Sequence, residues 1–179
     1  LGPCREFQAN LGLLIFEFSH FSPSEFERGR EFVGALDEFL GRLPRGWRYG
    51  VEIRNRTFLH PEYFAVLARH GAAHVFNSWH DMPSLGEQRA LPGSRTSPDF
   101  FGARLLLKPG RKYEEAVKLF SPYDRIKDTY PEGRADGVSL IQEARRQSGS
   151  ARAFIYVNNR FEGNALETIA AMVEQAARR

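Results

Sequence analysis

Two residues in this sequence are well placed for acid–base chemistry, because Glu52 and Arg54 stand two positions apart in a mostly apolar run. Residues at that spacing point to the same face of a β-strand, so the carboxylate and the guanidinium would lie side by side. A carboxylate beside an arginine has a pKa that its surroundings can tune, as a general acid or base requires. We therefore predict catalytic roles for Glu52 and Arg54. The alternative is a buried ion pair with a structural role.

Basic side chains in a second run suit an anionic ligand. Arg104 and Lys108 share one face of their predicted strand, with Leu106 between them. Such a cluster can bind a phosphate or a carboxylate group. A structural layer of ion pairs is the alternative.

Polar residues also follow the apolar runs at their carboxyl ends, where parallel α/β folds place their chemistry. The last run ends in Asn158 and Asn159, whose amides offer both a donor and an acceptor without a charge to desolvate. Asparagine is equally common in the turns that follow strands, and Trp79 could either flank a ligand or pack in the core. The predicted ligand-binding residues are Asn77, Trp79, Arg104, Lys108, Asn158 and Asn159.

Five apolar runs must position these residues. The first of them, Leu11–Phe18, is nearly continuously apolar, which is typical of a strand that is covered on both faces. No Asn-Gly hairpin joins them, and helical segments fill the connections, so we expect right-handed parallel crossovers and an α/β fold. The predicted strands are Leu11–Phe18, Tyr49–Arg54, Ala73–Asn77, Ala103–Lys108 and Ala153–Asn158.

The first predicted helix begins at Ser22-Pro23-Ser24-Glu25, which has the pattern of a capping box, and ends before Pro44. A long connection from His80 to Phe100 is rich in Pro, Gly and Ser. It has room for one helical turn near Leu85–Ala90, and it would be free to cover the strand ends. The other predicted helices are Pro61–Ala68, Tyr113–Phe120, Glu132–Gln147 and Ala165–Arg178.

The sequence lacks the motifs of several common sites. It contains no nucleophile elbow, phosphate loop or dinucleotide fingerprint, so we expect no cofactor. His20, His60 and His80 fall near strand ends, but no two of these three have the spacing of metal ligands, so we predict no metal site.

Composition narrows the class of protein. The chain has 179 residues, of which 42% are hydrophobic, and this fits one domain, residues 1–179. Cys4 is the single cysteine, which agrees with the reducing cytoplasm, and no apolar run is long enough to cross a bilayer. The formal net charge is only +3 and no run is rich in Lys and Arg, so nucleic-acid binding is the less favoured interpretation.

Four ordered blocks also carry a resemblance. GVEIRN (50–55), HVFNSW (74–79), ARLLLKPGRKY (103–113) and FIYVNNRFEGNA (154–165) resemble the YecE-like family, number seventy-two among the domains of unknown function. The resemblance implies a TIM-type (β/α) barrel, of which this chain would be the C-terminal part, with roughly the last five of eight strands. It also implies that the recurring polar and glycine positions of the family are Glu52, Arg54, Asn77, Arg104, Asn158, Asn159 and Gly163.

The chain departs from the family at its first strand. Glu17 and Ser19 stand where glutamine and proline are usual, and nothing before Leu1 supplies the family's earlier strands. Because five strands cannot close an ordinary barrel and exposed strand edges invite pairing, we expect either a fragment or a homodimer that covers those edges.

The resemblance brings no established reaction, and whether the protein is an enzyme stays open. We predict that it binds or processes a small anionic ligand, such as a phosphorylated one, at the carboxyl ends of the strands. Two alternatives remain: binding of nucleic acid by the same basic and aromatic face, or a fragment without activity.

Overall fold

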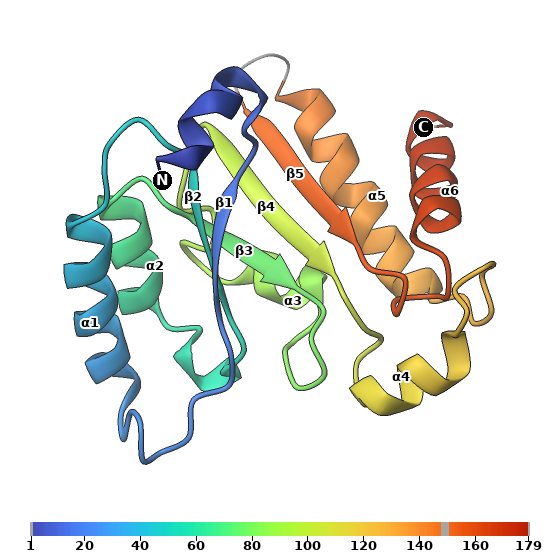
Figure 1. The fold of residues 1–179 in the computed structure, drawn as a ribbon, viewed down its shortest axis with the longest axis horizontal. Helices are drawn as coiled ribbons and strands as arrows, with labels where there is room; N and C mark the ends of the chain where they lie inside the picture. Colours follow the sequence, from blue (N-terminus) through green and yellow to red (C-terminus); the bar gives the residue numbers. More distant parts are fainter. Residues whose placement is uncertain (1, 148–150, 179) are drawn as a thin grey trace.

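A computed structural model describes residues 2–147 and 151–178 of the chain. Within these residues, five strands form one parallel sheet in the order β1-β2-β3-β4-β5, with helices in the connections (Figure 1). The strands are β1 (Leu14–Phe18), β2 (Tyr49–Ile53), β3 (Ala73–Asn77), β4 (Phe100–Leu105) and β5 (Arg152–Val157). The α/β class with parallel strands and helical crossovers is therefore confirmed.

The sheet is open, as a partial barrel would be. In the part of the chain that the structure describes, β1 and β5 each pair with one neighbour only. The helices are α1 (Gly29–Gly41), α2 (Pro61–Arg69), α3 (Leu85–Ala90), α4 (Tyr113–Phe120), α5 (Pro131–Arg146) and α6 (Ala165–Ala177), with 3₁₀ helices η1 (Pro3–Asn10) and η2 (Arg56–Phe58).

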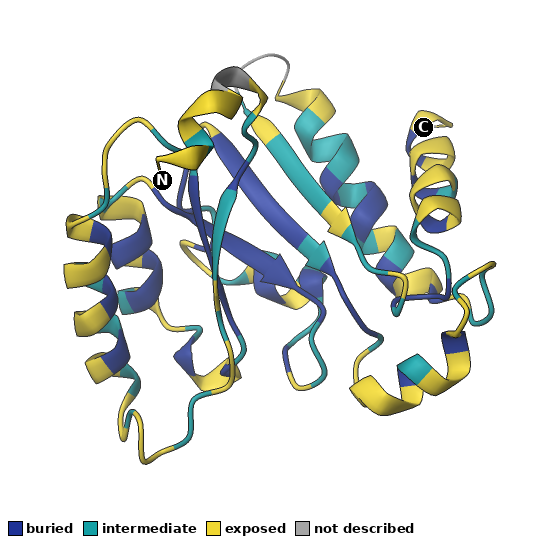
Figure 2. Cartoon of the chain, viewed as in Figure 1, coloured by how far each residue is buried: buried dark blue, intermediate teal, exposed yellow. Residues whose placement is uncertain are grey.

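Alternate residues of each strand serve two different faces of the sheet. On the outer face, β2 packs against α1 and α2, while β4 packs against α5 and α6. Figure 2 shows buried strands in the middle of the molecule and helices whose outward sides are exposed. The inner face carries a smaller apolar cluster that includes Leu13, Val75 and Phe100.

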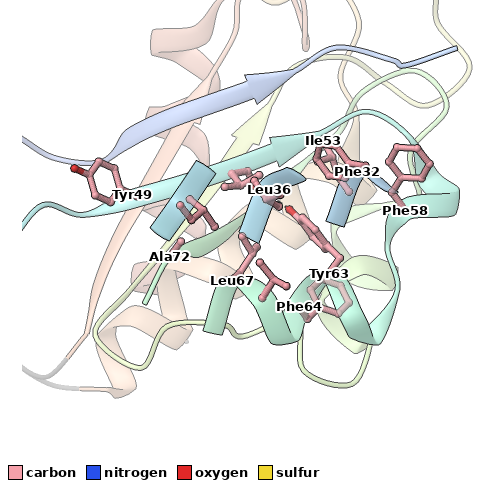
Figure 3. Close-up of a cluster of buried hydrophobic side chains, with 12 residues drawn as sticks. Phe32, Leu36, Tyr49, Ile53, Phe58, Tyr63, Phe64, Leu67 and Ala72 are labelled. Atoms are coloured by element: carbon pink, nitrogen blue, oxygen red, sulfur yellow. Dashed lines mark hydrogen bonds between the residues drawn. The ribbon is translucent and has the colours of Figure 1, made fainter. Parts of the chain in front are cut away.

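The outer core beneath α1 and α2 is largely aromatic. Figure 3 shows Phe32 of α1, Tyr63 of α2 and Ile53 of β2 in this cluster, and all three are almost fully buried. The rings of Phe32 and Phe58 stack with their centroids 5.3 Å apart. This packing fixes β2, which carries Glu52 on its opposite face.

Several predicted boundaries were wrong. The first strand begins at Leu14 and not at Leu11. The first helix does not begin at Ser22 but at Gly29. The capping interactions do form, since the Glu25 carboxylate accepts hydrogen bonds from the backbone and the hydroxyl of Ser22, but they close a single turn. The chain then brings Phe26 against Phe21 and Phe32 before the helix starts.

The fourth strand is also displaced from its predicted range of Ala103–Lys108. It begins at Phe100 and ends at Leu105, because the chain beyond it bonds to Ser78. The Ser78 hydroxyl accepts from the Leu106 amide, and the Ser78 carbonyl accepts from the Leu107 amide. Lys108 therefore lies in the following loop and not on the strand with Arg104.

Candidate functional site

Strand register brings charged residues together on the inner face of the sheet. Glu17 of β1 is the pairing partner of Glu52 of β2, and Arg104 of β4 is paired with Asn77 of β3. Neither Gly50 nor Gly102 has room for a side chain. A Cβ on Gly50 would lie 2.7 Å from Val75, and a Cβ on Gly102 would lie 2.6 Å from Leu13. These two glycines leave room for Leu13, which precedes β1, to lie against both β2 and β4 on the inner face.

Four side chains form a closed ring at the carboxyl end of this face, which we call the Glu–Arg ring: Glu17, Glu52, Arg54 and Arg104. Nη1 of Arg104 lies 2.5 Å from one oxygen of Glu17 and 2.6 Å from one oxygen of Glu52. Arg54 holds the other two oxygens, with Nη2 2.6 Å from Glu17 and Nε 3.3 Å from Glu52. Each carboxylate thus bridges both guanidiniums, and the formal charges of the ring cancel.

The two carboxylates differ in depth. The side chain of Glu52 is 0% exposed, whereas that of Glu17 is 34% exposed. Burial raises the pKa of Glu52, although Arg104 and Arg54 oppose this effect. Burial also acts to lower the pKa of Arg104, but its hydrogen bonds to Glu17 and Glu52 outweigh it and raise the pKa. Glu52 is therefore the deep carboxylate whose proton affinity is increased.

Trp79 covers one side of the Glu–Arg ring. The guanidinium carbon of Arg54 lies 3.9 Å from the centroid of the Trp79 ring, which is a close cation–π contact. Asn77 positions this tryptophan, since its side-chain oxygen accepts from the Trp79 amide at 3.2 Å while its nitrogen donates to the carbonyl of Ile53 at 3.1 Å. Asn77 is buried and engaged on both sides, so it supports the site from beneath.

The structure does not connect the remaining predicted residues to the Glu–Arg ring. The Asn158 oxygen accepts from the Arg160 amide, and the Asn159 oxygen accepts from the Ala165 amide. The Lys108 ammonium lies 5.6 Å from the centroid of the Tyr130 ring. Among the described residues, no hydrogen bond or ion pair joins these three to Glu52, Arg54 or Arg104. Their proposed contacts with a ligand remain predictions.

We predicted that the connection after β3 could cover the carboxyl ends of the strands, but its middle part lies elsewhere. Its middle part binds to the outer face, where Arg95 stacks over the rings of Phe76 and Phe101. The Thr96 hydroxyl accepts from the His74 amide and donates to the carbonyl of Ala72. The predicted turn of helix near Leu85–Ala90 is present as α3.

A shallow pocket adjoins the Glu–Arg ring. It has a volume of about 420 Å³ and is lined by Leu13, Ile15, Glu17, Arg104 and Tyr156. Its lining therefore includes both apolar and charged side chains.

Two acidic residues that matter lie outside the predicted set of site residues. Glu17 was noted at a strand end but was not assigned to the site, although it is the only charged residue in the run LGLLIFEF, which was a usable signal. Glu162 is fully buried and accepts from Arg134, from the Thr168 hydroxyl and from the Tyr130 amide. Since its oxygens are engaged within the protein, Glu162 has a structural role.

The described residues provide no group of three or more His, Cys, Asp or Glu side chains that could hold a metal ion. In the same part of the chain, none of the helices is both long enough and apolar enough to cross a membrane.

Residues 2–179 match the family described as protein of unknown function DUF72. The chain belongs to the DUF72 family. The predicted family resemblance is thus confirmed. No curated protein matched the sequence.

Solved DUF72 structures share the fold. A DUF72 protein from Enterococcus faecalis aligns with a TM-score of 0.61 at 14% identity, covering 99% of this chain and 65% of that one. A DUF72 protein from Thermotoga maritima aligns with a TM-score of 0.63 at 17% identity, covering 98% of this chain and 64% of that one. This chain therefore spans a little under two thirds of the length of these relatives.

Proposed function

We propose that this DUF72 protein binds a small anionic molecule at the carboxyl ends of its strands, with Arg54 and Arg104 as the residues that hold the anion. The observation that carries the proposal is the convergence of these two guanidiniums, from different strands, beside the fully buried Glu52. Two arginines aimed at one point match the geometry of a phosphate or carboxylate group.

Donor groups remain for such a ligand. A guanidinium has five N–H donors, and Nη1 of Arg104 makes both of its ion pairs in the Glu–Arg ring. The side chain of Arg104 is 25% exposed, so its other nitrogens are within reach of a molecule in the adjoining pocket.

Glu52 is the proposed acid–base residue. A carboxyl group with a raised pKa can exchange a proton with a bound substrate near neutral pH, and Arg54 and Arg104 would bring that substrate to it. Nucleic-acid binding by the same face stays a prediction from sequence. No contact among the described residues favours it over a small anion.

Isothermal titration with inorganic phosphate tests the binding step. We expect saturable binding that is lost in Arg104→Gln and kept in the control Arg42→Gln, whose side chain is 80% exposed and pairs with Glu38 on α1. Equal binding by the wild type and Arg104→Gln would contradict the proposed site. Once a substrate is known, Glu52→Gln should retain binding and lose turnover. Unchanged turnover would remove Glu52 from the mechanism.

A further inference from the structure

We infer that Glu17 occupies the place of the ligand's own anionic group, and that the ligand carries an apolar body. This inference rests on the proposed function, since it concerns the same two arginines. It names the ligand class as an oxyanion, either carboxylate or phosphate, attached to an alkyl or aromatic group.

The geometry of Glu17 is that of a bound ligand. One of its oxygens lies on Arg54 and the other on Arg104, at 2.6 Å and 2.5 Å. A carboxylate or phosphate from solution would make the same two charge-assisted contacts. Glu52 contacts the same two arginines but is enclosed by the protein. Of the two carboxylates, Glu17 is therefore the one that can move from the arginines into water.

The position of Glu17 makes that exchange feasible. Glu17 lies on β1, which is an edge strand in the described part of the sheet, and its side chain is 34% exposed. A carboxylate that moves from a half-open ion pair into water regains its hydration, so the net loss is small. The ligand's oxyanion would then restore the charge balance that Glu17 provides in the free protein.

The pocket beside Glu17 indicates what the rest of the ligand is like. Leu13, Ile15 and Tyr156 line it together with the charged Glu17 and Arg104. Tyr156 is 41% exposed, so its ring is accessible to a ligand in this pocket. A pocket of about 420 Å³ is within the size range of small-molecule sites. An apolar group linked to the oxyanion would cover these side chains.

Isothermal titration with four probes tests the inference: acetate, benzoate, inorganic phosphate and phenyl phosphate. We expect benzoate and phenyl phosphate to bind about tenfold more tightly than acetate and phosphate, because their rings bury apolar surface. In Glu17→Gln the affinity for all four probes should rise about tenfold, since the internal competitor is gone and the ring gains a net positive charge. The control Glu38→Gln replaces a side chain of α1 that is 75% exposed, and its affinity for the probes should match that of the wild type.

A second variant, Glu17→Asp, keeps the inference testable if Glu17→Gln does not fold. Glu17→Asp keeps the charge, but its shorter side chain cannot span both arginines, so it too should raise the affinity for the probes. Failure of every probe to bind any folded variant would overturn both the proposed function and this inference. Arg104-dependent binding that is equal in the wild type and the Glu17 variants would overturn the inference about Glu17 alone. Equal affinity for benzoate and acetate would overturn the apolar body of the ligand, and neither result would affect the proposed anion site.

Discussion

At the scale of single residues, the Glu–Arg ring combines a structural and a functional requirement. Four charges meet on the inner face, and every carboxylate oxygen of the ring contacts a guanidinium. Buried ion pairs stabilise a fold little in net terms, but removal of one partner leaves an uncompensated charge. The loss of Glu52 should therefore be far more damaging than the loss of an exposed glutamate.

We expect Glu52→Ala to lower the free energy of unfolding by about 3–5 kcal/mol, because Arg54 and Arg104 would keep their charges in a largely buried site. Urea unfolding measured at neutral pH checks this value. Glu38→Ala is the matched control, since that glutamate is 75% exposed and pairs with Arg42 one helical turn away. It should change the free energy by less than about 0.5 kcal/mol. Similar losses in both variants would contradict a buried ring.

His74 gives a prediction about pH. Burial, together with the nearby charge of Arg95, lowers the pKa of this histidine to about 3, and its Nδ1 lies 3.1 Å from the Tyr63 hydroxyl. The unfolded chain binds a proton at His74 below about pH 6.5, whereas the folded chain does not. Stability from this residue is therefore complete above pH 6.5 and falls by about 1.4 kcal/mol per pH unit as the pH decreases toward 3.

Urea unfolding of the wild type and of His74→Phe, at several pH values between 4.5 and 7.5, isolates this effect from the titration of the carboxylates. The difference in unfolding free energy between the two proteins should shift toward the variant as the pH falls. Substitution of the exposed His60 by Gln should leave the pH dependence of the wild type intact. A constant difference between the wild type and His74→Phe across this range would contradict a neutral buried histidine.

The scale of helices and strands explains how much the sequence could predict. The apolar runs located all five strands, because each strand packs apolar residues against the helices of the outer face. The boundaries failed at Ser22 and at Leu105, where local capping and the hydrogen bonds of Ser78 decided the outcome. Neither effect is visible in hydrophobic periodicity.

The candidate site was predictable in part for the same reason. The spacing of Glu52 and Arg54 places them on one face of β2, and both belong to the Glu–Arg ring. Glu17 and Arg104 join them only through strand register, which sequence spacing does not specify. Asn158 and Asn159 are engaged in turn interactions, which was the alternative stated for them.

Two glycines in helices give a prediction at this scale. A Cβ on Gly133 of α5 would lie 2.4 Å from the Tyr130 ring and 2.5 Å from the Phe161 ring, whereas a Cβ on Gly34 of α1 meets nothing within 4 Å. Gly34→Ala should therefore raise the unfolding free energy by about 0.5–1 kcal/mol through helix propensity. Gly133→Ala should lower it by about 1–3 kcal/mol through overpacking.

Thermal and urea unfolding of the two alanine variants measures both signs, and each variant serves as the control for the other. A rise in the unfolding free energy of both variants would show that the packing of α5 against Phe161 is looser than these contacts indicate.

At the scale of the whole molecule, the open sheet is the dominant feature. An edge strand with unpaired backbone groups favours association with another chain. Beside the β5 edge, α6 exposes three apolar residues along one side, with 78% of Leu166, 38% of Ile169 and 44% of Val173 accessible. Ile169 and Val173 also line an apolar pocket of about 440 Å³ together with Ile155 and Val157 of β5. This combination of edge and apolar helix face is the region where we propose that a second copy binds.

We expect light scattering to give a mass near twice the 20.4 kDa of one chain at micromolar concentration. Ile169→Lys should shift the mass to that of the monomer, because a charged side chain on the apolar face of α6 would have to be desolvated in the dimer. Since Ile169 is already partly exposed, the variant should retain the circular dichroism spectrum of the wild type. Glu174→Lys is the control, because it adds a lysine at a 66% exposed position of the same helix and should leave the dimer intact. A monomer at every concentration, or a dimer that survives Ile169→Lys, would show that this face of α6 does not mediate association.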